Sequence, residues 1–204
     1  MILSDYEVKI MIFTLNMLRQ KYSDYANPND KIYHLVRSGK LFPIAKGLYE
    51  DDPTVSGQYL ASSIYGPSYL SFEYALAYYS LIPEAVYTYT SATFEKKKKK
   101  TYTNTFGTFT YADVPSAVFP LGVTIIENNG YAMRIATPEK ALCDKLYSLS
   151  PVKNLKELKA LLFDDLRIDE EGFSKLNYNE IATLSERYKC NNVRALTKLL
   201  RRQV

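Results

Sequence analysis

Residues 27–49 read NPNDKIYHLVRSGKLFPIAKGLY, and this stretch decides the fold that we expect for the start of the chain. The turn residues at 27–29 break the chain, and residues 30–38 then follow the spacing of a helix. Gly39 is a usual C-terminal stop for a helix, and two short extended pieces follow at 41–44 and 47–49. The stretch therefore predicts a helix followed at once by a small basic hairpin.

The residues before this stretch predict two further helical pieces. Ser4 and Glu7 have the spacing of a capping box, so a buried helix is expected to begin at Ser4 and to reach Leu18. A short turn of helix is expected over residues 23–26. Helix, short helix, turn, helix and basic hairpin is the order of a winged helix-turn-helix. We therefore predict such a domain over residues 1–52, which ends in an acidic, turn-rich linker.

The predicted helix at 30–38 can be compared with what a recognition helix needs, which is one face for the core and one for the major groove of DNA. Ile32, Leu35 and Val36 fall on the inner side. The amino end of such a helix usually touches base edges, and the turn and the wing after it meet phosphates. The predicted DNA contacts are Asn29, Lys31, His34, Arg37, Ser38, Lys40 and Lys46. The alternative is an ordinary amphipathic helix whose polar residues are only solvated.

Residues 56–204 predict a second domain. Helical patterns occur over 58–64 and after Ser71, which is expected to cap the second of these helices. Val, Thr, Tyr, Phe and Ile then dominate residues 86–135, which predicts an antiparallel sheet. The Asn129-Gly130 pair within it is the clearest hairpin signal in the chain.

The end of the chain is predicted to be helical. Thr137 and Pro138 have the types expected at an N-cap and a first helical position, so a helix should run to about Ser148. A helical tail is expected from about residue 151, with helix starts marked by Asn154 and Asn177. The predicted fold class is thus α+β: an N-terminal winged helix-turn-helix, then a mixed domain with an antiparallel sheet flanked by helices and a helical C-terminal tail.

Composition excludes several classes of protein. With 204 residues, of which 47% are hydrophobic and 24% charged, the chain can bury a real core, and disorder is not expected. A net charge of +4 argues neither for nor against nucleic acid. No apolar run is long enough to span a membrane, and the start of the chain lacks the features of a signal peptide. We therefore expect a cytoplasmic protein with no membrane contact.

The few metal-ligating residue types are scattered. Cys143 and Cys190 lie far apart without a CxxC partner, which predicts buried, inert thiols in a reducing compartment. His34 is the only histidine, with no cysteine nearby. We expect neither a metal nor a cofactor.

The run of five lysines, residues 96–100, invites a nucleic-acid interpretation because each ammonium group could replace a counterion on a phosphate backbone. In an extended segment only about half of the side chains would address one surface. The alternative is a solvated hairpin tip. Lys96, Lys97, Lys98, Lys99 and Lys100 are therefore candidates for a secondary phosphate or partner contact.

An enzyme needs a set of catalytic residues placed together, and the sequence offers few candidates for one. Glu95 and Lys97 fit the E-x-K fragment of many nuclease sites, with Glu84 or Glu73 as a conceivable second metal ligand. Such a fragment arises easily by chance, and a glutamate beside five lysines also fits simple charge clustering. The chain has no P-loop, no G-x-S-x-G elbow and no H-E-x-x-H motif. We predict that it is not an enzyme.

Several motifs in order resemble one family. LVRSGKL at 35–41 and KGLY at 46–49 are similar to the recognition helix and wing of the AbiEi-type antitoxins. YGPSYLS at 65–71 with EYAL at 73–76, and RIATPEKAL at 134–142 before Asp144, resemble the second domain of that family. The long lysine run and the short second helix depart from the family pattern.

The resemblance implies a function that composition and spacing do not. Members of this family are encoded beside a nucleotidyltransferase toxin in type IV toxin-antitoxin systems. They repress their own operon by binding repeats in its promoter, and they neutralise the toxin through the second domain. The implied partners are double-stranded DNA, bound by a monomer or weak oligomer, and a cognate toxin. The alternative is a stand-alone regulator whose second domain binds a small ligand or another protein.

Overall fold

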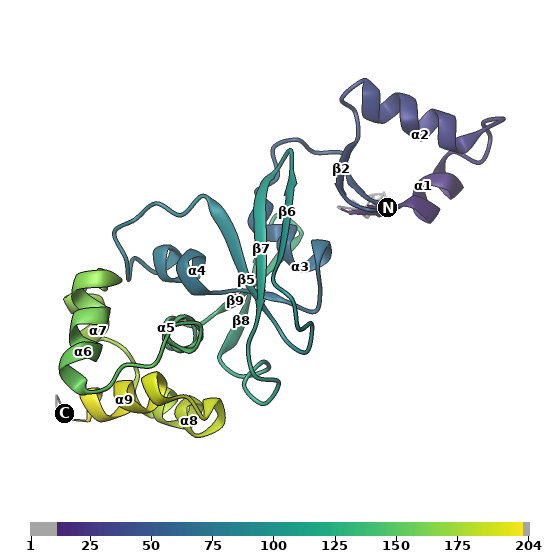
Figure 1. The fold of residues 1–204 in the computed structure, drawn as a ribbon. Helices are drawn as coiled ribbons and strands as arrows, with labels where there is room; N and C mark the ends of the chain where they lie inside the picture. The colour runs from purple at the N-terminus through teal and green to yellow at the C-terminus, as the bar shows by residue number, and fades with distance from the viewer. Residues whose placement is uncertain (1–11, 202–204) are drawn as a thin grey trace, which may run out of the picture.

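The computed structural model describes residues 12–201, which form an α+β fold with two sheets. A three-stranded sheet lies near the N-terminus, and a six-stranded mixed sheet flanked by helices makes up the middle of the molecule (Figure 1). The C-terminal helices lie at the far end from the N-terminal unit (Figure 1). No helix within residues 12–201 combines the length and the apolar character needed to cross a membrane.

From residue 12 onward, the N-terminal unit is built from two helices and three short strands. The helix pair consists of α1 (Leu15–Lys21) and α2 (Pro28–Arg37). The strands are β1 (Phe13–Thr14), β2 (Phe42–Ala45) and β3 (Leu48–Glu50), and β3 lies between the other two in an antiparallel arrangement.

Two predictions for this unit are wrong in detail. Residues 13–14 are not helical but pair with β3, so the helix that ends near Lys21 begins only at Leu15, capped by the Thr14 side chain. The expected start at Ser4 lies outside the described residues. Residues 23–26 form turns rather than helix. The apolar residues before Leu15 have the spacing of a helix, but residues 13–14 pair with β3 instead of extending α1.

The six-stranded sheet has the order β6-β7-β5-β4-β9-β8. Its strands are β4 (Tyr69–Leu70), β5 (Thr88–Thr93), β6 (Lys100–Asn104), β7 (Gly107–Asp113), β8 (Val123–Asn128) and β9 (Tyr131–Ala136). The Asn129-Gly130 hairpin between β8 and β9 is confirmed.

The prediction of an antiparallel sheet is wrong, because β5 pairs with β7 and β4 with β9 in parallel. The segment from residue 94 to residue 99, with most of the lysine run, carries the chain from β5 past the position of β7 to the sheet edge. The chain then returns as β7 between β6 and β5. Local turn signals report where a strand ends, but not which strand it will pair with.

Helices cover both faces of this sheet. Helix α3 (Ala61–Ile64), preceded by the 3₁₀ turn η1 (Gly57–Tyr59), lies on one face, and α4 (Phe72–Tyr78) and α5 (Pro138–Tyr147) lie on the other (Figure 1). The predicted helical tail is confirmed and packs beyond α5. Its elements are α6 (Leu155–Ala160), the π-helical turn η2 (Leu161–Asp165), α7 (Glu170–Ser174), α8 (Tyr178–Tyr188) and α9 (Asn191–Leu200).

The predicted helix starts follow from side-chain caps. Thr137, Asn154 and Asn177 each occupy an N-cap position, and each side chain accepts a hydrogen bond from a backbone N–H in the first turn of its helix. The cysteines agree with prediction only in part. Cys143 is buried, which raises the pKa of its thiol, but Cys190 is half-buried.

A polar network lies at the centre of the apolar core and is closed around one carboxylate. Asp144 Oδ1 accepts from Lys140 Nζ at 2.8 Å and from the Tyr188 hydroxyl. Its Oδ2 accepts from the hydroxyls of Tyr69 at 3.0 Å and Ser71 at 2.7 Å. Lys140 and Asp144 are both 0% exposed. Ser71 does stand before α4, but its hydroxyl serves Asp144 and not the expected helix cap.

Burial and charge act on this network in opposite directions. Burial lowers the pKa of Lys140, and the neighbouring Asp144 opposes this shift. Burial raises the pKa of the Tyr69 and Tyr188 hydroxyls, and the charge of Asp144 adds to the rise. Both tyrosines therefore stay neutral donors, and the network holds a charged pair that has no access to water.

Lys140→Met should destabilise the fold by about 3–5 kcal/mol, because it leaves the Asp144 carboxylate buried without its cation. Urea unfolding monitored by circular dichroism measures the loss. The matched control is Lys175→Met, which breaks an exposed Lys175–Glu171 pair with the same spacing of four residues. A Lys140→Met protein as stable as that control would contradict the assigned role of the network.

Candidate nucleic-acid interface

Helix α2 is defined by strong signals at both ends. Asn27 is its N-cap and accepts a hydrogen bond from the backbone N–H of Asn29 at 3.1 Å, and Pro28 occupies the first turn. At the other end Gly39 has a φ of +66°, and the N–H groups of Gly39 and Lys40 bond back to the carbonyls of Val36 and Leu35. This is a Schellman motif. The helix therefore begins two residues before the predicted start and ends where Gly39 predicted.

A small apolar core fixes α2 against α1. Leu18 from α1 and Ile32 from α2 are buried together with Phe13 and Leu41. Leu35 and Val36 are half-buried against the same cluster. The predicted inner face of α2 is therefore confirmed, and six residues, 22–27, connect the two helices through turns.

The opposite face of α2 brings together most of the predicted contact residues. Asn29, His34 and Arg37 are exposed on it, and Ser38 is exposed at its C-terminal end. The Ser38 hydroxyl donates to the carbonyl of Leu35, so its proton is already used within the helix end. Lys40 is exposed just beyond the stop.

Lys31 is less exposed than the other predicted contact residues. It is half-buried, and its ammonium group lies 4.6 Å from the centre of the Tyr25 ring. Its spacing of three residues to His34 and seven to Ser38 places it on their side of the helix. The turn residue Tyr25 therefore covers part of Lys31.

Two residues of the interface were missed by sequence reasoning. Tyr33 is 56% exposed between Asn29 and Arg37 on the same face, and the Arg37 guanidinium lies 5.7 Å from the centre of its ring. Arg19 of α1 donates from Nε to Asn29 Oδ1 at 2.9 Å. The spacing of four residues to Asn29 and Arg37 could have identified Tyr33. Nothing in the local sequence could have brought Arg19 to α2.

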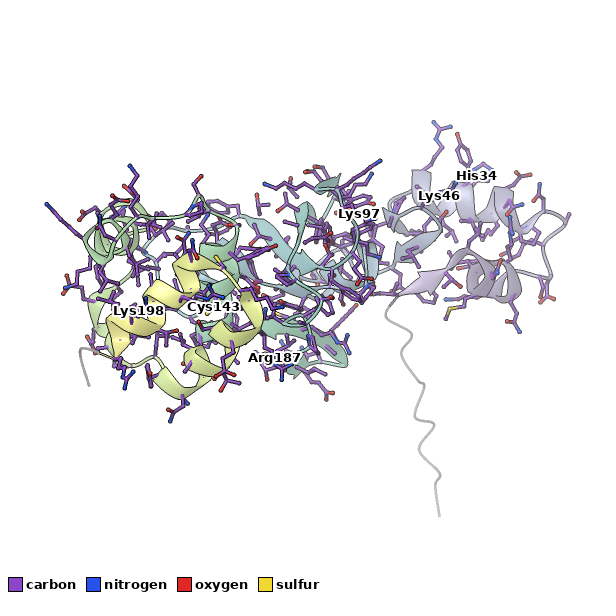
Figure 2. All side chains as sticks on the ribbon, turned by 60° about the horizontal axis from the view of Figure 1, so that its bottom comes forward. His34, Lys46, Lys97, Cys143, Arg187 and Lys198 are labelled. Carbon is purple, nitrogen blue, oxygen red and sulfur yellow. The ribbon has the colours of Figure 1, made fainter. Side chains whose placement is uncertain are left out.

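The β2–β3 hairpin carries Lys46 at its tip. Gly47, with a φ of +75°, makes the turn possible, and its carbonyl accepts from the N–H of Leu15 at 2.9 Å. Lys46 is exposed. Figure 2 shows Lys46 and His34 on the same side of the N-terminal unit. The tip of the hairpin and α2 thus offer basic side chains in the same direction.

The other edge of the hairpin contacts the six-stranded sheet. Asn104 at the end of β6 donates from Nδ2 to the carbonyl of Ile44 at 2.8 Å. Phe42 and Phe106 meet edge to face with ring centres 6.1 Å apart. The basic face of the N-terminal unit is therefore held in a fixed relation to the larger sheet.

The lysines of residues 96–100 differ in their contacts and exposure. Lys96 donates to the carbonyl of Gly66 at 3.1 Å and lies over the Tyr65 ring, and the backbone N–H of Lys97 donates to Asp113 Oδ2 at 2.6 Å. The side chains of residues 97–100 are exposed. The run is thus an ordered connection and not a loose tip, and its side chains point to more than one surface.

The residues considered for a nuclease are not gathered. Glu73 pairs with Lys145, and Glu84 pairs with Arg167 at 2.7 Å. Within residues 12–201 no group of three His, Cys, Asp or Glu side chains is placed to hold a metal ion. The expectation of a non-enzymatic protein stays a prediction.

Comparisons with known proteins add no identity to this geometry. No family model matches the chain. A search of curated proteins likewise found no match. The residues described above and the motifs in the sequence are therefore the features that bear on function.

A buried carboxylate lies at the base of the hairpin. Glu50 ends β3 and is 0% exposed, and its Oε1 accepts from the backbone N–H groups of Asp51 and Asp52. Its Oε2 and the Tyr131 hydroxyl are buried close to each other, and the carboxylate adds to the effect of burial in raising the pKa of that hydroxyl. Burial raises the pKa of Glu50, and the Asp52 N–H, the Tyr131 hydroxyl and the Asp51 N–H oppose the rise.

Glu50→Gln should raise the melting temperature at pH 7, because it removes the cost of burying a charge and keeps an acceptor for the two N–H groups. A carboxyl whose pKa is raised on folding destabilises the folded state above that pKa, and this penalty fades as the pH falls toward the ordinary value of 4.5. The gain should therefore be smaller at pH 4.5 than at pH 7. Thermal unfolding at both pH values measures it, and an equal gain at both would contradict the account.

Proposed function

We propose that this protein is a DNA-binding transcription regulator whose N-terminal unit is a winged helix-turn-helix. The support is the exposed face of α2 together with Lys46 on the hairpin tip, which point the same way in Figure 2. The order of β1, β3 and β2 beside a helix pair is consistent with a wing that follows a recognition helix.

The charges on this face suit a polyanion. Arg37, Lys40 and Lys46 are exposed cations, and the exposed carboxylate of α2, Asp30, accepts from the Asn27 side chain at 2.9 Å. In the proposed complex Asn29, His34 and Arg37 face base edges, and Lys40 and Lys46 contact phosphates. Arg19, held at the amino end of α2 by Asn29, is an additional phosphate contact.

Exposure ranks the predicted residues. Arg37, the last residue of α2, is exposed, whereas Lys31 is half-buried beside Tyr25. We therefore assign Lys31 a phosphate contact and not a base contact. Ser38, whose hydroxyl donates within the helix end, is left with its oxygen lone pairs for DNA.

Arg37→Glu should weaken binding to a duplex from the region upstream of the protein's own gene by about tenfold or more, because it places a carboxylate at the groove. Lys31→Glu should weaken binding less. Lys46→Gln should lower the slope of log K against log salt by about one unit. Gel-shift or anisotropy titrations at several salt concentrations measure all three effects.

The matched control is Lys156→Glu, an equal charge change on an exposed residue of α6 outside the proposed interface. Thermal unfolding should show that each variant is folded. If Arg37→Glu binds DNA as tightly as the Lys156→Glu control, the assignment of α2 as the recognition helix is wrong.

We propose further that the protein is the antitoxin and autorepressor of a type IV toxin-antitoxin system. This half of the proposal is supported by the motifs that resemble the AbiEi-type antitoxins. Two of those motifs, at 65–71 and 134–142, are joined with Asp144 through the buried network of Ser71 and Lys140. The resemblance in these two motifs therefore falls on residues that support the fold.

Co-expression with a nucleotidyltransferase encoded by a flanking gene should restore growth that this enzyme alone inhibits. The control is an Arg37→Glu protein, which should lose repression but keep the rescue if neutralisation is a property of the second domain. A flanking region without a nucleotidyltransferase gene would remove the antitoxin role and favour a stand-alone regulator whose second domain binds a small ligand or another protein.

A further inference from the structure

A cavity of about 350 Å³ lies between helices α4 and α5 and the β6 edge of the six-stranded sheet. Strands β5, β6 and β7 form its floor, and its walls come from the start of α4 and the end of α5. This volume is at the lower end of the range for small-molecule pockets, so a ligand of about mononucleotide size fits it.

Charge distinguishes this cavity from the largest cavity described. Its lining contains Lys99, Lys100 and Lys145, and Glu73 is its carboxylate. Glu73 pairs with Lys145. Lys100 is the register partner of Tyr111, whose hydroxyl donates to the Ala61 carbonyl of α3 on the opposite face of the sheet, so Lys99 is the ammonium group left in excess in the cavity. The larger cavity, of about 690 Å³ among the C-terminal helices, has one lysine and one glutamate in its lining and no such excess.

The floor presents hydroxyl groups in a row. Thr90 of β5 is the register partner of Thr110 of β7, which is in turn the partner of Thr101 of β6. Residues paired in this way have their side chains on the same face of a sheet. The Thr90 hydroxyl accepts from the N–H of Tyr74 and donates to the carbonyl of Ser71 at the start of α4. The Thr101 and Thr110 hydroxyls have no hydrogen-bond partner within residues 12–201.

One wall of the cavity is apolar. Phe72, the first residue of α4, lines the cavity with a φ of +53°, an uncommon conformation for an aromatic residue. The preceding residue, Ser71, donates its hydroxyl to Asp144, so the buried network fixes the chain where Phe72 turns toward the cavity. Leu149 adds apolar surface beyond the end of α5.

We propose that this cavity binds a phosphorylated small molecule of about mononucleotide size. Lys99 and Lys145 hold its phosphate groups, and the Thr101 and Thr110 hydroxyls donate to phosphate oxygens. Phe72 and Leu149 contact the less polar part of the ligand. This site goes beyond the proposed DNA-binding function and assigns part of the lysine run to a small molecule.

The site is placed to affect the N-terminal unit. Strands β6 and β7 leave the cavity and meet at the turn where Asn104 holds the carbonyl of Ile44. A ligand that shifts the two strands would also shift this contact. The ligand would then act as an effector of the regulator.

The test is isothermal titration of the full chain with ADP, with inorganic phosphate and adenosine as probes of the two halves of the ligand. We expect saturable ADP binding in the micromolar range and weaker binding of phosphate. The Lys99→Ala/Lys100→Ala variant should bind ADP about tenfold more weakly. Glu73→Gln should bind it severalfold more tightly, because the carboxylate that competes for Lys145 is removed.

The matched control is Lys153→Ala/Lys156→Ala, which removes two exposed lysines outside this cavity. Thr110→Val tests the floor with little change of shape, and it should also weaken ADP binding. Thermal unfolding establishes that each variant is folded.

Three outcomes would overturn the proposal. They are no saturable ADP binding up to millimolar concentration, an equal loss of binding in the control variant, and a loss confined to duplex DNA in the Lys99→Ala/Lys100→Ala variant. The last result would assign these lysines to the DNA backbone. Because α2 is unchanged in every variant, the proposed base contacts can stand when this site fails.

Discussion

The Asp144 carboxylate is the point on which the larger part of the fold depends. It joins Tyr69 and Ser71 at the end of β4, Lys140 one turn earlier in α5, and Tyr188 at the end of α8. A buried carboxylate is costly unless each oxygen finds donors, and both oxygens here have two. The same contacts fix the start of α4. One carboxylate thus holds the sheet, α4 and α5, and the C-terminal helices in place relative to one another.

The N-terminal unit is stabilised in a different way. Its own core is small, with Leu18 and Ile32 at the centre, and it gains support from outside through Ile44, which is buried against the larger core. The hydrogen bond from Asn104 and the Phe42–Phe106 contact add to this support. A small core leaves much of α2 free to expose polar groups, and the contact with the sheet keeps that exposed face in one orientation.

The sequence was most informative where structure is determined by neighbouring residues. The caps at Thr137, Asn154 and Asn177, the stop at Gly39 and the hairpin at 129–130 were all predicted, because each depends on a few adjacent side chains. The parallel pairing of β5 with β7 was missed, because strand order depends on contacts across the chain. The same limit applies to the site. The exposed face of α2 followed from spacing, whereas the contact of Arg19 with Asn29 and the partial burial of Lys31 beside Tyr25 depend on how α1 and its turn pack.

The position of the lysine run also bears on solubility. Strand β6 lies at the edge of the sheet and begins with Lys100, directly after four further lysines. An edge strand exposes unpaired backbone groups that can pair with the edge of another molecule, and charged residues, lysine above all, are a common protection against this. Two molecules that approached edge to edge along β6 in a parallel arrangement would bring their lysines together at close range. The repulsion between these charges disfavours that pairing whatever the lysines bind.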